Sequence, residues 1–125
     1  MARRNEYVEH LLELLRPFGP VVARAMFGGH GLYRDGVFFA IVAYDTLYLK
    51  VDEQTAPDFE ALGLGPFVYE SKLGERIVMS YREAPPAALE DPAVMAEWAR
   101  KAYGVALRTR RAPAPKRPRA AAPRS

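Results

Sequence analysis

Three residues suited to polar chemistry, Arg24, His30 and Tyr33, lie around the sequence Gly28-Gly29-His30-Gly31. Glycine-rich loops bind phosphate when their N–H groups lie at a helix N-terminus, usually with a lysine close by. Here a strand pattern follows the glycines and no lysine is near, so we expect the glycines to form a tight turn or bulge. Arg24, His30 and Tyr33 are then a candidate surface for a ligand or partner, but they specify no reaction.

The chain has few residues for covalent or metal chemistry. It contains no cysteine, which fits a reducing compartment, and none of its serines lies in a Gly-x-Ser-x-Gly turn. Its two histidines, His10 and His30, are distant in sequence, which disfavours a transition-metal site. We therefore predict no catalytic residues, no metal and no cofactor.

Charge is distributed unevenly along this chain of formal net charge +3. Residues 108–125 hold seven basic residues and no acidic one, which leaves 11 basic against 15 acidic residues, a formal −4, in 1–107. We predict a folded domain at 1–107 and a disordered tail of Arg, Lys, Pro and Ala at 108–125. The tail either aids solubility or contacts nucleic acid weakly and without sequence preference. The residues for such contact are Arg108, Arg110, Arg111, Lys116, Arg117 and Arg119.

The candidate surface belongs to a stretch, 24–52, that predicts consecutive antiparallel strands. We expect strands at 21–27, 31–34, 37–43 and 47–51. Asp35-Gly36 is typical of a type I′ hairpin turn, in which both central residues need positive φ. The strand at 37–43 is apolar on both faces, as expected where a sheet is covered on both sides or closed by a dimer.

Helical patterns flank these strands. Apolar spacing predicts a helix at 4–16, and Thr55 begins a capping-box pattern for a short second helix. Asp91-Pro92 is a typical start for a last helix, which we expect to fade between Gly104 and Arg111. Its single tryptophan, Trp98, is expected to pack it onto the sheet.

A further hairpin is expected from Pro66 to Tyr81, around Leu73-Gly74. The order of elements predicts an α+β fold in two layers, with an antiparallel sheet of five to six strands and N-terminal, central short and C-terminal helices. The start of the chain has no signal-peptide pattern, and its longest apolar run, 37–44, is far below the ~20 residues of a membrane helix. We expect a soluble, cytoplasmic protein without membrane contact.

The motif Arg-Ala-Met-Phe-Gly-Gly-His-Gly-Leu-Tyr at 24–33 resembles the N-terminal domain of the TfoX/Sxy family. The resemblance covers roughly residues 5–108. It continues at 38–41, 47–52, 67–69 and 79–81, and at a Pro-rich break before the helix that carries Trp98.

The resemblance implies a secretion-chaperone-like α+β domain of a kind that often forms homodimers. It also implies a part in regulating competence genes for DNA uptake, together with other transcription factors, and it brings no catalytic residues. The basic tail stands where full-length regulators have a C-terminal helical domain. We expect a non-catalytic regulatory or interaction module with protein partners, the transcription machinery among them. The alternative is a small-molecule or enzymatic site around Arg24, His30 and Tyr33.

Overall fold

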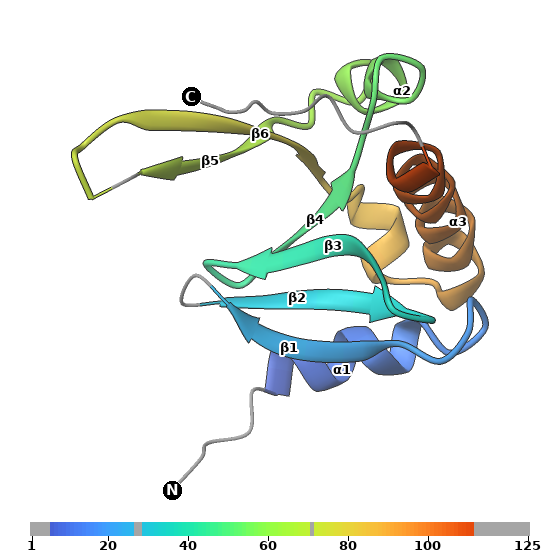
Figure 1. The fold of residues 1–125 in the computed structure, drawn as a ribbon. Coiled ribbons are helices and arrows are strands. Elements are labelled where there is room, and N and C mark those ends of the chain that lie inside the picture. The colour runs from blue at the N-terminus through green and yellow to red at the C-terminus, as the bar shows by residue number, and fades with distance from the viewer. Residues whose placement is uncertain (1–5, 27–28, 71, 112–125) are drawn as a thin grey trace, which may run out of the picture.

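The computed structural model describes residues 6–26, 29–70 and 72–111 (Figure 1). Its elements are, in chain order, α1 (Glu6–Leu14), β1 (Val22–Met26), β2 (Gly29–Arg34), β3 (Val37–Ala43), β4 (Thr46–Lys50), α2 (Ala56–Glu60), β5 (Pro66–Glu70), β6 (Arg76–Glu83), the 3₁₀ helix η1 (Pro86–Leu89) and α3 (Pro92–Arg111). The predicted α+β class, with an antiparallel sheet and three α-helices, is confirmed. The short η1 was not expected; it begins at Pro86, the second of the two prolines after β6.

All six strands form one antiparallel sheet in the order β1-β2-β3-β4-β6-β5. Tight turns join the first four strands in sequence order. The chain then passes through α2 and returns in β5, which becomes the edge strand because β6 takes the place beside β4. The β5–β6 hairpin extends away from the helices (Figure 1).

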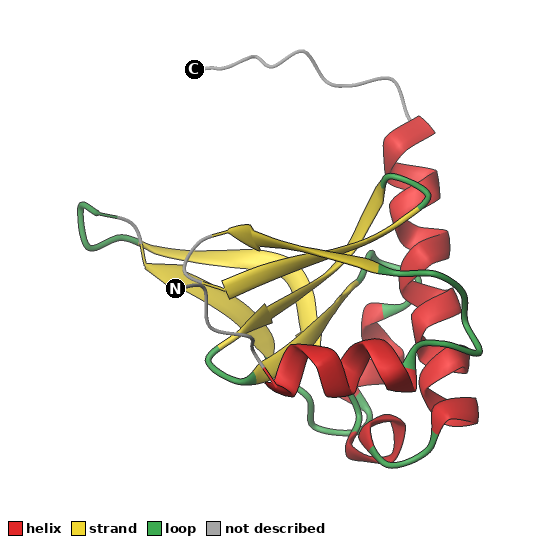
Figure 2. Ribbon diagram, turned by 90° about the horizontal axis from the view of Figure 1, so that it is seen from below, coloured by secondary structure: helices red, strands yellow, loops and turns green. Residues whose placement is uncertain are grey.

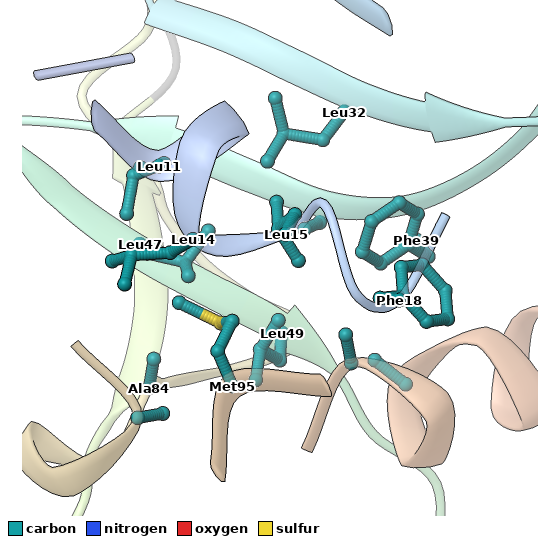
Figure 3. Close-up of a cluster of buried hydrophobic side chains, with 14 of the residues drawn as sticks. Leu11, Leu14, Leu15, Phe18, Leu32, Phe39, Leu47, Leu49, Ala84 and Met95 are labelled. Carbon is teal, nitrogen blue, oxygen red and sulfur yellow. The ribbon is translucent and has the colours of Figure 1, made fainter. Parts of the chain in front are cut away.

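The main core lies on one face of the sheet, where the helices gather (Figure 2). Leu11 and Leu14 of α1, Phe59 of α2 and Met95 of α3 all join this cluster. The sheet contributes alternate residues, such as Leu47 and Leu49 of β4 (Figure 3). A fully buried leucine or phenylalanine contributes about 1.5–3 kcal/mol by leaving water, so this cluster is the main source of stability.

A bulge changes the alternation in β3. Leu32 pairs with Ala40 and Tyr33 with Phe38, so Phe39 is an extra residue on the β3 side. Phe39 and Ala40 therefore both join the helix-side core, while Phe38 and Ile41 belong to the opposite face. This is the physical reason why the strand is apolar on both faces.

The cap before α2 differs from the sequence expectation. Thr55 makes no side-chain cap for α2; its hydroxyl instead accepts a hydrogen bond from the N–H of Asp52 (3.1 Å). Asp52 Oδ1 in turn accepts from the N–H groups of Gln54 (3.0 Å) and Thr55 (3.1 Å). The reciprocal capping pair is thus Asp52 with Thr55, three residues earlier than predicted.

Helix α3 begins as predicted, because Asp91 Oδ1 accepts a hydrogen bond from the N–H of Ala93 (2.9 Å). It continues past Gly104 to Arg111, so the expected boundary at residue 107 falls inside the helix. Trp98 packs edge-on against Phe59, with ring centroids 4.9 Å apart, and so joins α3 to α2; it also packs against the core cluster to which the sheet contributes. Within the described residues, no helix has the length and apolar character needed to cross a membrane.

Candidate binding surface on the open sheet face

The face of the sheet opposite the helices has its own smaller cluster of apolar side chains. Its members are Ile41, Ala43, Phe67 and Tyr81, with Phe38, Tyr48 and Met79 partly buried around them. All seven belong to strands β3 to β6, and the helices pack on the other side (Figure 2). This open face therefore presents partly exposed aromatic rings.

Five side chains on this face form a continuous line across five strands, from β1 through β2, β3 and β4 to β6, which we call the cation–aromatic row: Arg24, Tyr33, Phe38, Lys50 and Tyr81. The guanidinium of Arg24 lies 5.5 Å from the ring centroid of Tyr33. The Tyr33 ring stacks on Phe38 at 5.1 Å, and Phe38 lies 5.8 Å from Tyr81. The Lys50 ammonium completes the row, 4.8 Å from the Tyr81 centroid. The three rings are thus in contact with one another, and a cation lies over the ring at each end of this series of contacts.

Gly31 makes the close packing of the row possible. A Cβ at this position would lie 2.5 Å from Met26 Sδ and 2.9 Å from a ring carbon of Phe38. Gly29 is restricted by the backbone, because its Cβ would clash with the carbonyl oxygen of Val42. Neither glycine has positive φ, so both serve close approach instead of the turn angles we expected. Gly28 lies outside the described residues.

Lys50 is half-buried, and in the described part of the chain no carboxylate forms an ion pair with it. Burial lowers the pKa of its ammonium below the ordinary value, since desolvation disfavours the charged form. Two of the nearby carboxylates are already paired with arginines, whereas Glu53, which lines a cavity of ≈ 480 Å³ together with Lys50, forms no ion pair among the described residues. Arg108 donates to Asp52 Oδ2 (2.8 Å), and Arg82 donates to Glu60 (2.9 Å). Lys50 is therefore the uncompensated cation at this end of the row.

Three open cavities follow the row. One of ≈ 210 Å³ lies at Arg24, Tyr33 and Asp35. A second of ≈ 320 Å³ is lined by Phe38, Lys50 and, from α3, Thr109, and a third of ≈ 480 Å³ also has Lys50 and Thr109 in its wall. The row is thus accessible at both ends, and the C-terminal turn of α3 forms part of the wall at the Lys50 end.

The structure brings together two of the three predicted surface residues. Arg24 and Tyr33 are neighbours in the row, whereas His30 is paired with Val42 of the helix-side core. Paired residues of antiparallel strands share a face. His30 therefore lies on the face opposite to Arg24 and Tyr33, and its buried Nδ1 has no hydrogen-bond partner among the described residues.

Of the residues predicted for nucleic-acid contact, Arg108 is part of the folded domain. Its Nη2 and Nε donate to Asp52 at 2.8 and 3.2 Å, which ties the end of α3 to the end of β4. The backbone of Arg110 and Arg111 continues α3. Lys116, Arg117 and Arg119 lie outside the described residues.

The sequence reasoning missed Phe38, Lys50 and Tyr81. The Asp35-Gly36 turn could have predicted Phe38. In a hairpin with a two-residue turn, the residues that flank the turn pair with each other in order, and this places Tyr33 opposite Phe38. Lys50 and Tyr81 are paired only because β6 lies beside β4, and no local pattern indicates that pairing.

The row offers groups that bind, namely two cations and three rings, and its one ionisable phenol near Lys50 is held neutral. Burial, with a smaller contribution from Tyr33, raises the pKa of Tyr81 to about 12. In residues 6–26, 29–70 and 72–111, no group of three or more His, Asp or Glu side chains is placed to hold a metal ion.

These features define a small α+β domain, with helices on one face of an antiparallel sheet and a cation–aromatic row on the other. The chain belongs to the TfoX N-terminal domain family, whose sequence model matches residues 13–106. That range includes every residue of the row. No curated protein matches the chain.

Proposed function

We propose that this protein is a non-catalytic regulatory module that acts by binding, with the open sheet face as its binding surface. The observation that supports this proposal best is the cation–aromatic row, in which the partly exposed rings of Tyr33 and Phe38 lie between Arg24 and a Lys50 that has no ion pair among the described residues. Aromatic side chains and arginine are the groups that contribute most to protein recognition surfaces.

The proposal also includes a biological role, which rests on the resemblance to TfoX regulators. The module acts in the cytoplasm and contributes to expression of competence genes for DNA uptake, together with transcription factors. The alternative of a small-molecule or enzymatic site at Arg24, His30 and Tyr33 is weaker, because His30 lies on the other face of the sheet.

A complementation experiment tests the regulatory role. The gene is deleted from its host, and transcripts of DNA-uptake genes are measured after return of the wild type, of Arg24→Gln/Lys50→Gln, or of Arg16→Gln. Arg16 is exposed beyond the end of α1 and is paired only with Glu13 among the described residues, so it controls for loss of charge. We expect the wild type and Arg16→Gln to restore the transcripts and the row variant to fail. Full restoration by the row variant would refute the proposal.

A further inference from the structure

The order of groups along the cation–aromatic row specifies a ligand with both negative charge and flat rings. Arg24 and Lys50 mark the β1 and β4 positions, and Tyr33 and Phe38 lie between them on β2 and β3. Neighbouring strands are ~4.8 Å apart, so the two cations are separated by about 14 Å across the sheet. A chain that alternates anionic groups with planar rings over this length matches both features.

We propose that the row binds single-stranded nucleic acid, with phosphates at Arg24 and Lys50 and bases against Tyr33 and Phe38. This inference rests on the proposed binding role of the open face and names its ligand. Antiparallel sheets bind RNA in this manner in the RNA-recognition modules, where aromatic side chains on the sheet stack two or three bases. Base stacking on aromatic rings tolerates any sequence, since every base has a π-face.

Lys50 is prepared for an incoming phosphate. Its ammonium is half-buried, lies over the ring face of Tyr81 and lacks a carboxylate partner in the described chain. The carboxylate of Asp52 is neutralised by Arg108, and Arg82 by Glu60, so neither competes for the ligand or for Lys50. Burial has removed part of the hydration of the Lys50 ammonium, and a bound phosphate would compensate the charge of that ammonium.

Acidic groups confine the ligand to the Lys50 end of β4. Tyr48, two residues before Lys50 on the same face, is paired with Glu83, and that carboxylate raises the pKa of the Tyr48 phenol, after burial itself. Phosphates are repelled from that part of the face. The exposed Asp35 lines the cavity beside Arg24 and limits how far the strand extends beyond it.

The basic C-terminal segment begins where the row ends. Thr109 shares a cavity with Phe38 and Lys50, so the last turn of α3 lies beside the proposed track. Arg108 is occupied by Asp52, and six further basic residues follow it in the sequence, which gives the chain more charge for phosphate contacts. Such contacts contribute affinity that falls steeply with salt and carries no sequence information.

Fluorescence anisotropy with the full chain tests the inference. The probes are labelled dT12, rU12 and a 12-base-pair duplex, each at 50 and 200 mM salt. We expect dT12 or rU12 to bind at least tenfold more tightly than the duplex, whose paired bases hide their faces. Comparing dT12 with rU12 decides whether the ligand is DNA or RNA. Failure of both single strands to bind, or tighter binding of the duplex, would overturn the inference.

Variants locate the contact. Lys50→Gln and Tyr33→Leu, which retains an apolar side chain, should each weaken binding by about 5- to 100-fold. Lys50→Arg and Tyr33→Phe should retain binding, and Arg16→Gln should stay within twofold of the wild type. Circular dichroism checks that each variant is folded. If Lys50→Gln does not fold, the Tyr33→Leu and Tyr33→Phe pair decides the question. Equal affinity of wild type and Tyr33→Leu would overturn the proposed stacking.

A full-chain variant with Lys116→Gln, Arg117→Gln and Arg119→Gln separates the two sources of affinity. We expect it to lower the salt dependence while binding remains sensitive to Tyr33→Leu. If the triple variant abolishes binding and Tyr33→Leu has no effect, the interaction belongs to the tail and the inference is wrong. Light scattering measures the oligomeric state and so tests whether a second copy of this chain occupies the open face. A wild-type dimer that Tyr33→Leu dissociates would identify the row as an interface between copies.

The two proposals fail in different ways. If Arg24→Gln/Lys50→Gln loses gene regulation but the wild type binds no single strand, the proposed regulatory role stands and nucleic acid is refuted as its ligand. If the wild type binds single strands but Arg24→Gln/Lys50→Gln restores the transcripts fully, the nucleic-acid ligand stands and the regulatory role is refuted.

Discussion

At the scale of single residues, the two described glycines of the Gly-Gly-x-Gly motif both lie on β2 but have different tasks. Gly29 allows β3 to approach its backbone at Val42, and Gly31 leaves room for Met26 and Phe38. An added methyl group is obstructed by a fixed carbonyl in one case and by side chains that have room to adjust in the other. Gly29 is thus required for the fold, and Gly31 for the surface.

Gly29→Ala should lower the free energy of unfolding by about 2–3 kcal/mol, the typical cost of forcing atoms into a filled space. Gly65→Ala is a matched control, because nothing lies within 4 Å of its Cβ position and its φ is not positive. Urea denaturation measures both. A Gly29→Ala protein as stable as Gly65→Ala would contradict the close approach between β2 and β3.

Asp52 combines two contacts whose loss should be measurable. Asp52→Ala removes the capping bonds to Gln54 and Thr55 and the ion pair with Arg108, and we expect a loss of about 1–2 kcal/mol. Asp58→Ala, which removes only an exposed pair with Lys101, should cost under about 0.5 kcal/mol.

The effect of Asp52 should depend on pH. Burial opposes ionisation, but the bonds from Arg108, Thr55 and Gln54 together hold the pKa of Asp52 below its ordinary value of 3.8. Its stabilising contribution is therefore present above the unfolded pKa and is lost as pH falls through the folded value. The difference between wild type and Asp52→Ala should shrink between pH 5 and pH 2. A constant difference across this range would mean that the charge of Asp52 is unimportant.

At the scale of elements, the hairpin turns show which local features the sequence defines. Asp35 and Gly36 have φ of 51° and 77°, as the type I′ prediction requires. Tyr44 and Asp45 adopt the same conformation, with φ of 54° and 55°, although neither is glycine or asparagine. The β3–β4 turn is therefore strained, and Tyr44 is 78% exposed at its tip.

Relief of this strain is testable. Asp45→Gly should raise the free energy of unfolding by about 0.5–1 kcal/mol, since glycine adopts positive φ without a steric penalty. Gly36→Ala, which meets no atom within 4 Å, should lower it by about 1 kcal/mol for the same reason. Thermal unfolding of the two variants should show shifts of opposite sign, and shifts of the same sign would exclude the explanation.

The limits of sequence reasoning also lie at the element scale. Strand β3, the Asp35-Gly36 turn and the start of α3 have local signals, and each was predicted within one or two residues. His30 lies on the face opposite to Tyr33 because β2 already begins at Gly29 and residues three apart in a strand point to opposite faces; the sequence expectation began this strand at residue 31. The pairing of Lys50 with Tyr81 depends on β6 joining β4 across 30 residues of chain.

At the scale of the whole molecule, the sheet separates an apolar core on one face from a surface of aromatic rings and cations on the other. The helix side holds the core that keeps the fold together, and the open side holds rings and cations. Tyr81 belongs to the open side, yet its phenol is buried enough that its pKa rises to about 12. The folded protein should therefore resist deprotonation there more strongly than the unfolded chain does.

The free energy of unfolding should consequently fall as pH rises from 10 towards 12, because the unfolded chain releases the Tyr81 proton first. We expect Tyr81 to account for about 2 kcal/mol of this fall. Tyr81→Phe should show a shallower decline between pH 9 and 11.5 in urea denaturation. The buried Lys50 acts in the opposite direction, since its pKa is lowered. An equally steep decline in Tyr81→Phe would place the alkaline sensitivity elsewhere.

The central claim is that the open sheet face, and not the helix layer, is the binding surface. Titration of the ¹⁵N-labelled full chain with dT12, followed by amide NMR shifts, tests it most directly. We predict the largest shifts at Arg24, Tyr33, Phe38 and Lys50, with little change along α1. Shifts confined to α1 and the outer side of α3, or to residues 108–125 alone, would contradict the claim.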